Sequence, residues 1–161
     1  MYAFVMNILN DFEMLLPLAV AWAREQESHI LKHGEPLCEL EKRDAQQIGV
    51  RDIERVRLLR VDAIPFPQDE VLGVVAREIG FISPQTQGMA LGYGVFIRED
   101  TGRNREIVAH ELVHVAQYQR LGFDEFLRAY LWQCLTVGYA NSPLEREAIE
   151  VSARVINELG A

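Results

Sequence analysis

Hydrophobic side chains recur every three to four residues along much of this chain, and that spacing is typical of one buried face of an α-helix. The pattern predicts helices over residues 11–33, 39–48, 69–79, 103–122, 124–137 and 144–159. Gly34, Gly80 and Gly122 follow three of these segments, where glycine commonly ends a helix. Pro17 predicts a local irregularity inside the first one.

Two stretches between the predicted helices have the composition of β-strands. Residues 55–64 are rich in apolar and β-branched side chains and end at Pro65, and residues 89–98 form an apolar run that contains glycine. A chain of 161 residues is long enough for one well-filled core and too short for two comfortable domains. We therefore expect a mainly helical α+β fold, a single domain over residues 1–161, with a small sheet before the helix at 103–122.

The last predicted helix has a clear start signal. Ser142 is a typical N-cap residue, and Pro143 suits the first helical position. Glu145 follows Ser142 by three residues, the spacing of a capping box, in which the glutamate side chain turns back to the backbone of the cap. Glu145 therefore has a structural role open to it.

Charge and hydropathy exclude two classes of partner. The formal net charge is −8 and no run of basic residues occurs, so we expect no nucleic acid bound through its phosphates. The longest apolar run, residues 14–23, has about half the length of a membrane span. No Lys or Arg precedes Arg24 to form the basic start of a signal peptide. We expect a cytoplasmic protein with no membrane partner.

Cys38 and Cys134 are the two cysteines of the chain. They lie far apart and lack the C-x-x-C spacing of metal and redox motifs. A reduced compartment is the simplest interpretation, and a single disulfide between them is the alternative.

Residues 110–114 read His-Glu-Leu-Val-His and lie inside the predicted helix at 103–122. Because residues four apart share one face of a helix, His110 and His114 can bind one metal ion together. Glu111 lies beside that face, where its carboxylate can take a proton from a metal-bound water. The alternative is that both histidines merely pack on a half-buried helix face. The H-E-x-x-H pattern favours a zinc site.

A zinc site of this kind needs a third protein ligand. No histidine follows His114, and Arg120 stands six residues on, where an extended form of the motif has its third histidine. The ligand is therefore a carboxylate, a histidine from upstream, or absent. The downstream carboxylates are Asp124, Glu125, Glu145, Glu147, Glu150 and Glu158.

The H-E-x-x-H motif, followed some thirty residues later by a helix that bears Glu-x-x-Ala, resembles the gluzincin group of zinc metallopeptidases. The chain is also similar in size to minimal cytosolic members and to ImmA/IrrE-like regulators. The resemblance covers residues 89–150. It implies a zincin-like core over about 55–161, and the helical N-terminal part, about 1–54, matches no family known to us.

The resemblance implies that Glu145 is the third ligand, because in several such families the ligand lies three residues before an alanine, here Ala148. Glu147 is the alternative, since other gluzincins place the alanine directly after the ligand. The two glutamates project to nearly opposite helix faces, so only one can bind the metal. Ile149 stands where some relatives have aspartate, so a carboxylate partner for a ligating histidine must come from elsewhere.

What the resemblance implies for function is a zinc-dependent metallopeptidase with one Zn²⁺ per chain and a peptide or protein substrate. Glu111 would activate the zinc-bound water for attack on a peptide bond and pass its proton to the leaving amine. The oxyanion usually needs a donor, for which Tyr139 is our first candidate and Tyr118 and Tyr93 are alternatives. The alternative function is a zinc-binding regulatory or scaffold module without proteolytic activity of its own. A purely structural metal site would leave Glu111 without a role.

A second histidine pair, His29 and His33, is also four residues apart, with Cys38 nearby. No glutamate follows its first histidine to act as a base. The helix dipole also explains a histidine near a helix C-terminus. We expect no functional metal at this pair.

Overall fold

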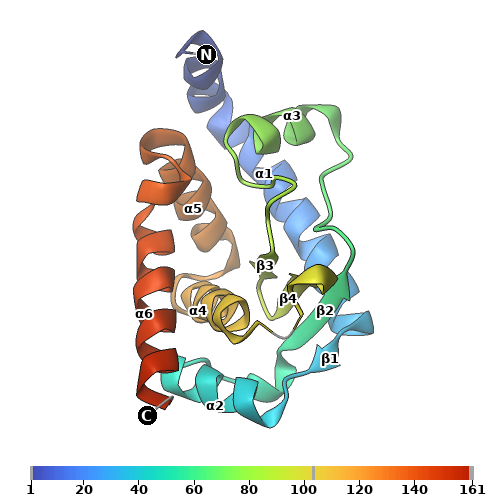
Figure 1. Cartoon of the computed structure of the whole chain (residues 1–161). Helices are drawn as coiled ribbons and strands as arrows, with labels where there is room; N and C mark the ends of the chain where they lie inside the picture. The colour runs from blue at the N-terminus through green and yellow to red at the C-terminus, as the bar shows by residue number, and fades with distance from the viewer. Residues whose placement is uncertain (1, 103, 160–161) are drawn as a thin grey trace.

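The computed structural model describes residues 2–102 and 104–159 (Figure 1). Its α-helices are α1 Tyr2–His33, α2 Glu39–Ile48, α3 Glu70–Glu78, α4 Arg105–Leu121, α5 Phe123–Val137 and α6 Pro143–Leu159. Its strands are β1 Glu35–Pro36, β2 Arg57–Val61, β3 Gly88–Leu91 and β4 Gly94–Arg98. Its short 3-10 helices are η1 Ile53–Arg55, η2 Glu99–Thr101 and η3 Tyr139–Asn141. The fold is a mainly helical α+β domain, which confirms the predicted class.

The four strands form one mixed sheet in the order β1-β2-β4-β3. The inner strands β2 and β4 are parallel, and the edge strands β1 and β3 pair antiparallel to them. Ile30 of α1 lies against Gly94 of β4, and Glu111 of α4 lies against Gly88 of β3. Because residues 94 and 88 face opposite sides of the sheet, α1 covers one side and α4 the other. Edge strand β3 therefore lies next to the H-E-x-x-H helix.

Helix α4 runs through the middle of the molecule, where Figure 1 shows it nearly end-on between the sheet and α6. It packs against α2, α5, α6 and β3. The helix begins at Asn104, whose side chain accepts a hydrogen bond from the Glu106 amide at 3.0 Å, and it ends at Gly122. Its buried residues are Val108, Ala109, Glu111, Leu112, Val113, His114, Val115, Gln117 and Tyr118. Polar side chains of α4 are thus enclosed together with the apolar ones.

Helix α1 is longer than the sequence predicts, because it begins at Tyr2 and continues through Pro17 to His33. Asn10 and Asp11 interrupt the apolar run in the sequence, but both are exposed on the outer face of this helix. The buried face continues past them at helical spacing, through Ile8, Phe12, Leu16, Ala19 and Ala23. Residues of α1 join the sheet, α4 and α5 in one hydrophobic core, and the division at residue 54 stays a prediction.

The predicted strand over 55–64 is shorter in the structure. Its first residue ends η1, and β2 covers only Arg57–Val61. Apolar composition continues beyond the strand because Ile64 is buried in the core without pairing in the sheet.

The prediction of a single strand over 89–98 is wrong, because this segment is a β-hairpin. Leu91 pairs with Gly94, which leaves Gly92 and Tyr93 as a two-residue turn. Gly92 has a φ of 64°, a left-handed conformation that glycine adopts without the strain of a side chain. The glycines of this run therefore mark the turn.

Two expectations about the chain as a whole can also be compared with the structure. Among the described residues, no helix combines the length and apolar character needed to cross a membrane. Cys38 and Cys134 are both free, so the alternative of a disulfide between them is wrong.

Candidate metal centre

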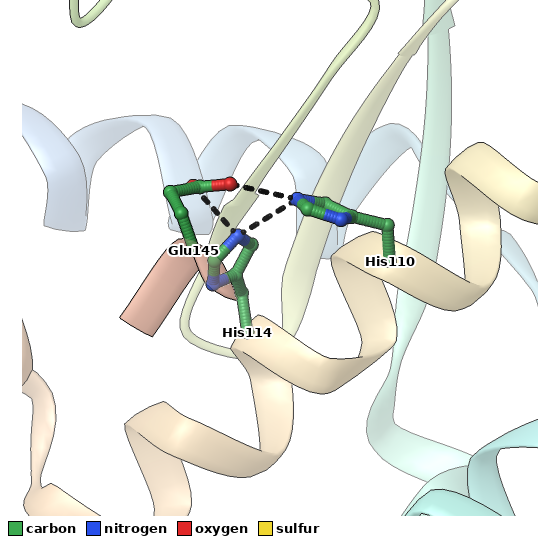
Figure 2. A group of neighbouring side chains, drawn as sticks. All are labelled: His110, His114 and Glu145. Atoms are coloured by element: carbon green, nitrogen blue, oxygen red, sulfur yellow. Dashed lines mark hydrogen bonds and ion pairs between the residues drawn. The ribbon is translucent and has the colours of Figure 1, made fainter. Parts of the chain in front are cut away.

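His110 and His114 of α4 meet Glu145 of α6 in one cluster (Figure 2). The Nε2 atom of His114 lies 3.0 Å from Oε1 of Glu145, and Nε2 of His110 lies 3.1 Å from Oε2. The two Nε2 atoms are 3.2 Å apart. Four ligands arranged tetrahedrally about 2.0–2.1 Å from a zinc ion are about 3.3–3.4 Å from one another. The cluster is therefore close to the geometry of a metal site, and this group can bind a metal ion.

One oxygen of the Glu145 carboxylate supports a cation at this position. Glu145 is 2% exposed, and its Oε2 is buried with no hydrogen-bond donor among the described residues. The nearby His110 nitrogen is not aligned to donate to it. Leaving a buried carboxylate oxygen without a partner is costly, and a metal ion facing Oε2 removes that cost.

The start of α6 directs Glu145 toward the histidines. Ser142 accepts a hydrogen bond from the Glu145 amide through Oγ at 3.4 Å, which is one half of the predicted capping box. The other half is missing, because the Ser142 amide donates to the carbonyl of Tyr139 instead. The Glu145 carboxylate is thus free of the cap and lies in the cluster.

Tyr130 of α5 completes the surroundings of Glu145. Its hydroxyl donates to Oε1 of Glu145 at 2.5 Å, in a buried position. Sequence reasoning missed this residue, because an aromatic side chain at helical spacing indicates only a core position. No local signal connects α5 with the start of α6.

A second missed residue, Gln117, contacts the other side of His114. Its Oε1 lies 2.7 Å from Nδ1 of His114, and its Nε2 donates to the Leu144 carbonyl and to Oε2 of Glu147, both at 3.0 Å. Arg120 forms two hydrogen bonds to the Glu147 carboxylate, at 2.7 and 2.8 Å. Glu147, the alternative third ligand, is thus paired with Arg120 and lies outside the metal-ligand group.

Burial and the neighbouring charges shift the pKa values of three residues here. Burial opposes ionisation of Glu145, but the contacts with His110 and His114 and the hydrogen bond from Tyr130 outweigh this effect and lower its pKa well below the usual range. Burial also opposes protonation of His114, yet contacts with Glu145 and Glu111 raise its pKa overall. Burial raises the pKa of Glu111, and the nearby histidines oppose that rise. Glu145 therefore stays ionised beside the two histidines.

Glu111 lies beside the cluster at 6% exposure, next to the first residue of β3. A Cβ atom at Gly88 would be 2.9 Å from both Cγ and Oε1 of Glu111. The glycine therefore makes the space that the Glu111 side chain occupies between helix and strand.

A cavity of about 750 Å³ opens over these residues. Its walls are β3 with the loop before it, and the face of α6 that carries Ile149, Ala153 and Ile156, while α4 contributes His110, Glu111 and His114. None of the described residues that line it is Lys or Arg. The α6 wall is thus mixed, because Ser152 and Asn157 line it beside the apolar side chains, and acidic groups lie near the cluster.

The three tyrosines considered as oxyanion donors occupy different positions. Tyr139 lines the cavity and is 45% exposed, and burial raises the pKa of its hydroxyl, which stays protonated and able to donate. Tyr118 also lines the cavity but is buried against Phe126. Tyr93 lies outside the cavity lining, and its hydroxyl donates to Asp52 at 3.2 Å.

The other residues considered as ligands lie apart from the cluster. Asp124 forms an ion pair with Arg24 at 2.7 Å. Among the described residues, no group of three potential ligands contains the remaining candidates, Glu125, Glu150, Glu158, His29, His33 and Cys38. His33 donates from Nδ1 to the carbonyl of His29 at 2.9 Å, a local helix contact.

Part of the chain matches a model of a known protein family. Residues 81–122 match the eCIS core domain, which is associated with zincin-like metallopeptidase-type proteins of contractile injection systems. No curated protein matches the chain, and no solved structure does. The matched segment spans the hairpin and α4, so it contains the H-E-x-x-H motif but ends before Glu145. The motif segment of this chain is therefore similar to the eCIS core domain, and its histidines form part of a potential metal-binding group.

Proposed function

We propose that this protein is a zinc-dependent metallopeptidase of the gluzincin type. His110, His114 and Glu145 are the zinc ligands, and Glu111 is the general base. The observation that carries this proposal is the meeting of the H-E-x-x-H histidines with a buried glutamate from a distant helix, beneath a cavity that also exposes Glu111. Two imidazoles and one carboxylate are a ligand set used by zinc peptidases.

The chemistry divides between the ion and the side chains. When bound, zinc acts as a Lewis acid that polarises a carbonyl and lowers the pKa of water to about 7. Glu111 accepts a proton from the attacking water and donates it to the leaving amine. Burial raises the pKa of Glu111, and this makes its carboxylate a better acceptor for the proton of the water. Tyr139, on the cavity wall, donates a hydrogen bond to the oxyanion.

A peptide is the substrate class that the cavity favours. β3 is an edge strand of the sheet and lines the cavity, so its outer edge can pair with an extended peptide. The opposite wall, formed by Ile149, Ala153 and Ile156, favours an apolar substrate side chain. An acidic side chain would be disfavoured, because no Lys or Arg is among the described lining residues.

A second candidate function is a zinc-binding regulatory or scaffold module that does not cleave peptides. The observation that favours it is the match of residues 81–122 to the eCIS core domain, which is associated with contractile injection systems. Both functions use the same metal ligands, and only the peptidase needs Glu111 as a base.

Zinc content tests the site itself. Purified protein is expected to contain about one zinc per chain, and His110→Ala is expected to abolish it because the variant lacks one of three ligands. The control is the double variant His29→Ala with His33→Ala, which removes an exposed histidine pair of the same spacing and should leave the zinc content unchanged. Equal zinc in the wild type and the His110 variant would contradict the assignment.

Activity of Glu111→Gln separates the two functions. This variant keeps its zinc, because the side chain is outside the ligand group, and loses hydrolysis by about 10²–10⁴-fold, as expected for a missing general base. Cleavage of a peptide library, followed by mass spectrometry, is the measurement. A Gln variant that cleaves as fast as the wild type would refute the peptidase mechanism. Absence of cleavage by fully zinc-loaded wild type would favour the module without proteolytic activity.

A further inference from the structure

Gln117 is 0% exposed, and the amide of its side chain has only one orientation that satisfies its neighbours. Its Nε2 lies 3.0 Å from the Leu144 carbonyl and 3.0 Å from Oε2 of Glu147. A carbonyl and a carboxylate can only accept hydrogen bonds, so the NH₂ group must face them. The amide oxygen of Gln117 therefore faces His114.

This orientation decides which nitrogen of His114 carries the proton. The Gln117 oxygen can only accept, and it lies 2.7 Å from Nδ1 of His114. Nδ1 must therefore be the donor. In a neutral imidazole the other nitrogen then has a free lone pair, and that atom, Nε2, points to Glu145 and His110 (Figure 2). The hydrogen-bond network thus selects the tautomer that a metal ligand needs.

Glu147 holds Gln117 in this orientation. Arg120, whose guanidinium can only donate, forms two hydrogen bonds to the Glu147 carboxylate and keeps it an acceptor. The side chain of Arg120 is 54% exposed and that of Glu147 is 35% exposed, whereas Gln117 is fully buried. A chain of hydrogen bonds therefore runs from the surface to the cluster and connects α4 with α6. It passes from Arg120 through Glu147 and Gln117 to His114.

We propose that Gln117 and Glu147 are positioning residues of the metal centre, which fix the tautomer and the ring orientation of His114. This inference rests on the proposed metal site and not on proteolysis. Ligating histidines usually donate their second nitrogen to a carboxylate, a carbonyl or a water. Here the partner is an amide oxygen, and the carboxylate lies one contact further away. Glu147 thus acts on the metal without binding it.

The test compares Gln117→Met with Gln119→Met. Methionine is similar in size to glutamine but cannot accept the Nδ1 proton strongly or donate to Leu144 and Glu147. Gln119 is a control on the same helix, because its amide also connects α4 with another segment, with both ends bound to the backbone of Arg51 at 2.8 Å. Zinc affinity, measured by competition with a chelator, is expected to fall about 10- to 100-fold in Gln117→Met. The zinc affinity of Gln119→Met should stay within about twofold of the wild type, because Gln119 contacts none of the three residues proposed as zinc ligands.

A spectroscopic measurement distinguishes positioning from general support of the fold. Proteins substituted with Co²⁺ are compared by their visible absorption, which reports coordination geometry. Gln117→Met is expected to change the spectrum, whereas Gln119→Met keeps that of the wild type. If Gln117→Met does not fold, Glu147→Gln takes its place, because that side chain lies partly in solvent. It removes the charge that Gln117 faces, so zinc affinity should fall in the same direction by a smaller factor.

Three outcomes would overturn the inference. Wild-type affinity in both Gln117→Met and Glu147→Gln would show that the network does not act on the metal. Equal losses in Gln117→Met and Gln119→Met would show a general effect on α4. A wild-type protein that binds no zinc would contradict the proposed function and this inference together. If the wild type binds zinc and the Gln117 and Glu147 variants bind it with the same affinity, only this inference is contradicted.

Discussion

The two carboxylate oxygens of Glu145 have different surroundings, although they are chemically equal. Oε1 accepts a hydrogen bond from the Tyr130 hydroxyl and lies near His114. Oε2 is close to His110 and has no hydrogen-bond donor among the described residues. The tyrosine thus occupies one oxygen and leaves the other for a cation. The Tyr130 hydroxyl therefore decides which carboxylate oxygen of Glu145 is free to face a cation.

Tyr130→Phe is expected to destabilise the metal-free protein by about 1.5–3 kcal/mol, because it removes a buried hydrogen bond to a charged group. The measurement is the free energy of unfolding in denaturant. Tyr118→Phe is a matched control, because this tyrosine is also buried but its hydroxyl has no hydrogen-bond partner among the described residues. A loss of stability in Tyr130→Phe no larger than that in the control would contradict the role assigned to the hydroxyl.

Gly88→Ala tests the position of Glu111. The added Cβ would lie 2.9 Å from Cγ and Oε1 of Glu111, so the carboxylate must move. Displacement of a catalytic group by about 1 Å can lower the rate by roughly 10²-fold. We expect a loss of peptide hydrolysis of that order, with the zinc content unchanged. Full activity of Gly88→Ala would show that Glu111 does not need its observed position.

The β3–β4 hairpin is the element that brings the sheet edge to α4. Its turn is stabilised by Glu27 of α1, whose carboxylate accepts a hydrogen bond from the Tyr93 amide at 2.9 Å. The same carboxylate occupies the space above Gly92, where a Cβ atom would lie 2.1 Å from Oε1. The long first helix thus supports the strand that lines the cavity.

Gly92→Ala is expected to destabilise the protein more than Gly49→Ala does. Both glycines have a positive φ, and alanine in that conformation costs about 1–2 kcal/mol. Only at residue 92 does the new methyl group also displace Glu27, and loss of that hydrogen bond adds roughly 1.5–3 kcal/mol. No atom lies within 4 Å of a Cβ built at Gly49. Unfolding in denaturant measures the difference, and equal losses at the two sites would contradict the support by Glu27.

At the scale of the whole molecule, the cluster joins helices that are distant in the sequence. α4 supplies two members and α6 the third, and the two helices pack against each other. A ligand that binds only the folded chain stabilises it by mass action. Zinc bound by this cluster would therefore stabilise the complete fold as well as the site.

We expect zinc at 100 times its dissociation constant to stabilise the protein by about 2.7 kcal/mol. For a chain of this size, that corresponds to a rise in Tm of roughly 5–10 °C. Thermal unfolding with added zinc, compared with unfolding in excess chelator, measures the shift. Glu145→Ala should lose most of it, because one ligand is missing. A shift of equal size in this variant would exclude Glu145 as a ligand.

Local sequence alone determined most helices and half of the site. Helical spacing of apolar residues predicted α2 to α6 closely, because a helix forms from contacts between residues three and four positions apart. The same locality placed His110 and His114 on one face, with Glu111 beside them. The hairpin is not predicted, because an apolar segment that contains two glycines is compatible with one strand as well as with two strands and a turn. Only the pairing of β3 with β4 distinguishes the two.

Only the tertiary structure decided the surroundings of the histidines. The resemblance favours Glu145 over Glu147 as third ligand, and the packing of α6 on α4 places the first in the cluster and the second on Arg120. The contact of Gln117 with His114 is local, three residues along α4. The contacts of Gln117 with α6 span 27 and 30 residues, and the contact of Tyr130 with Glu145 spans 15 residues, so these have no local signal. Such contacts depend on which helix faces meet, and that is determined by the burial of the whole core and not by any single segment.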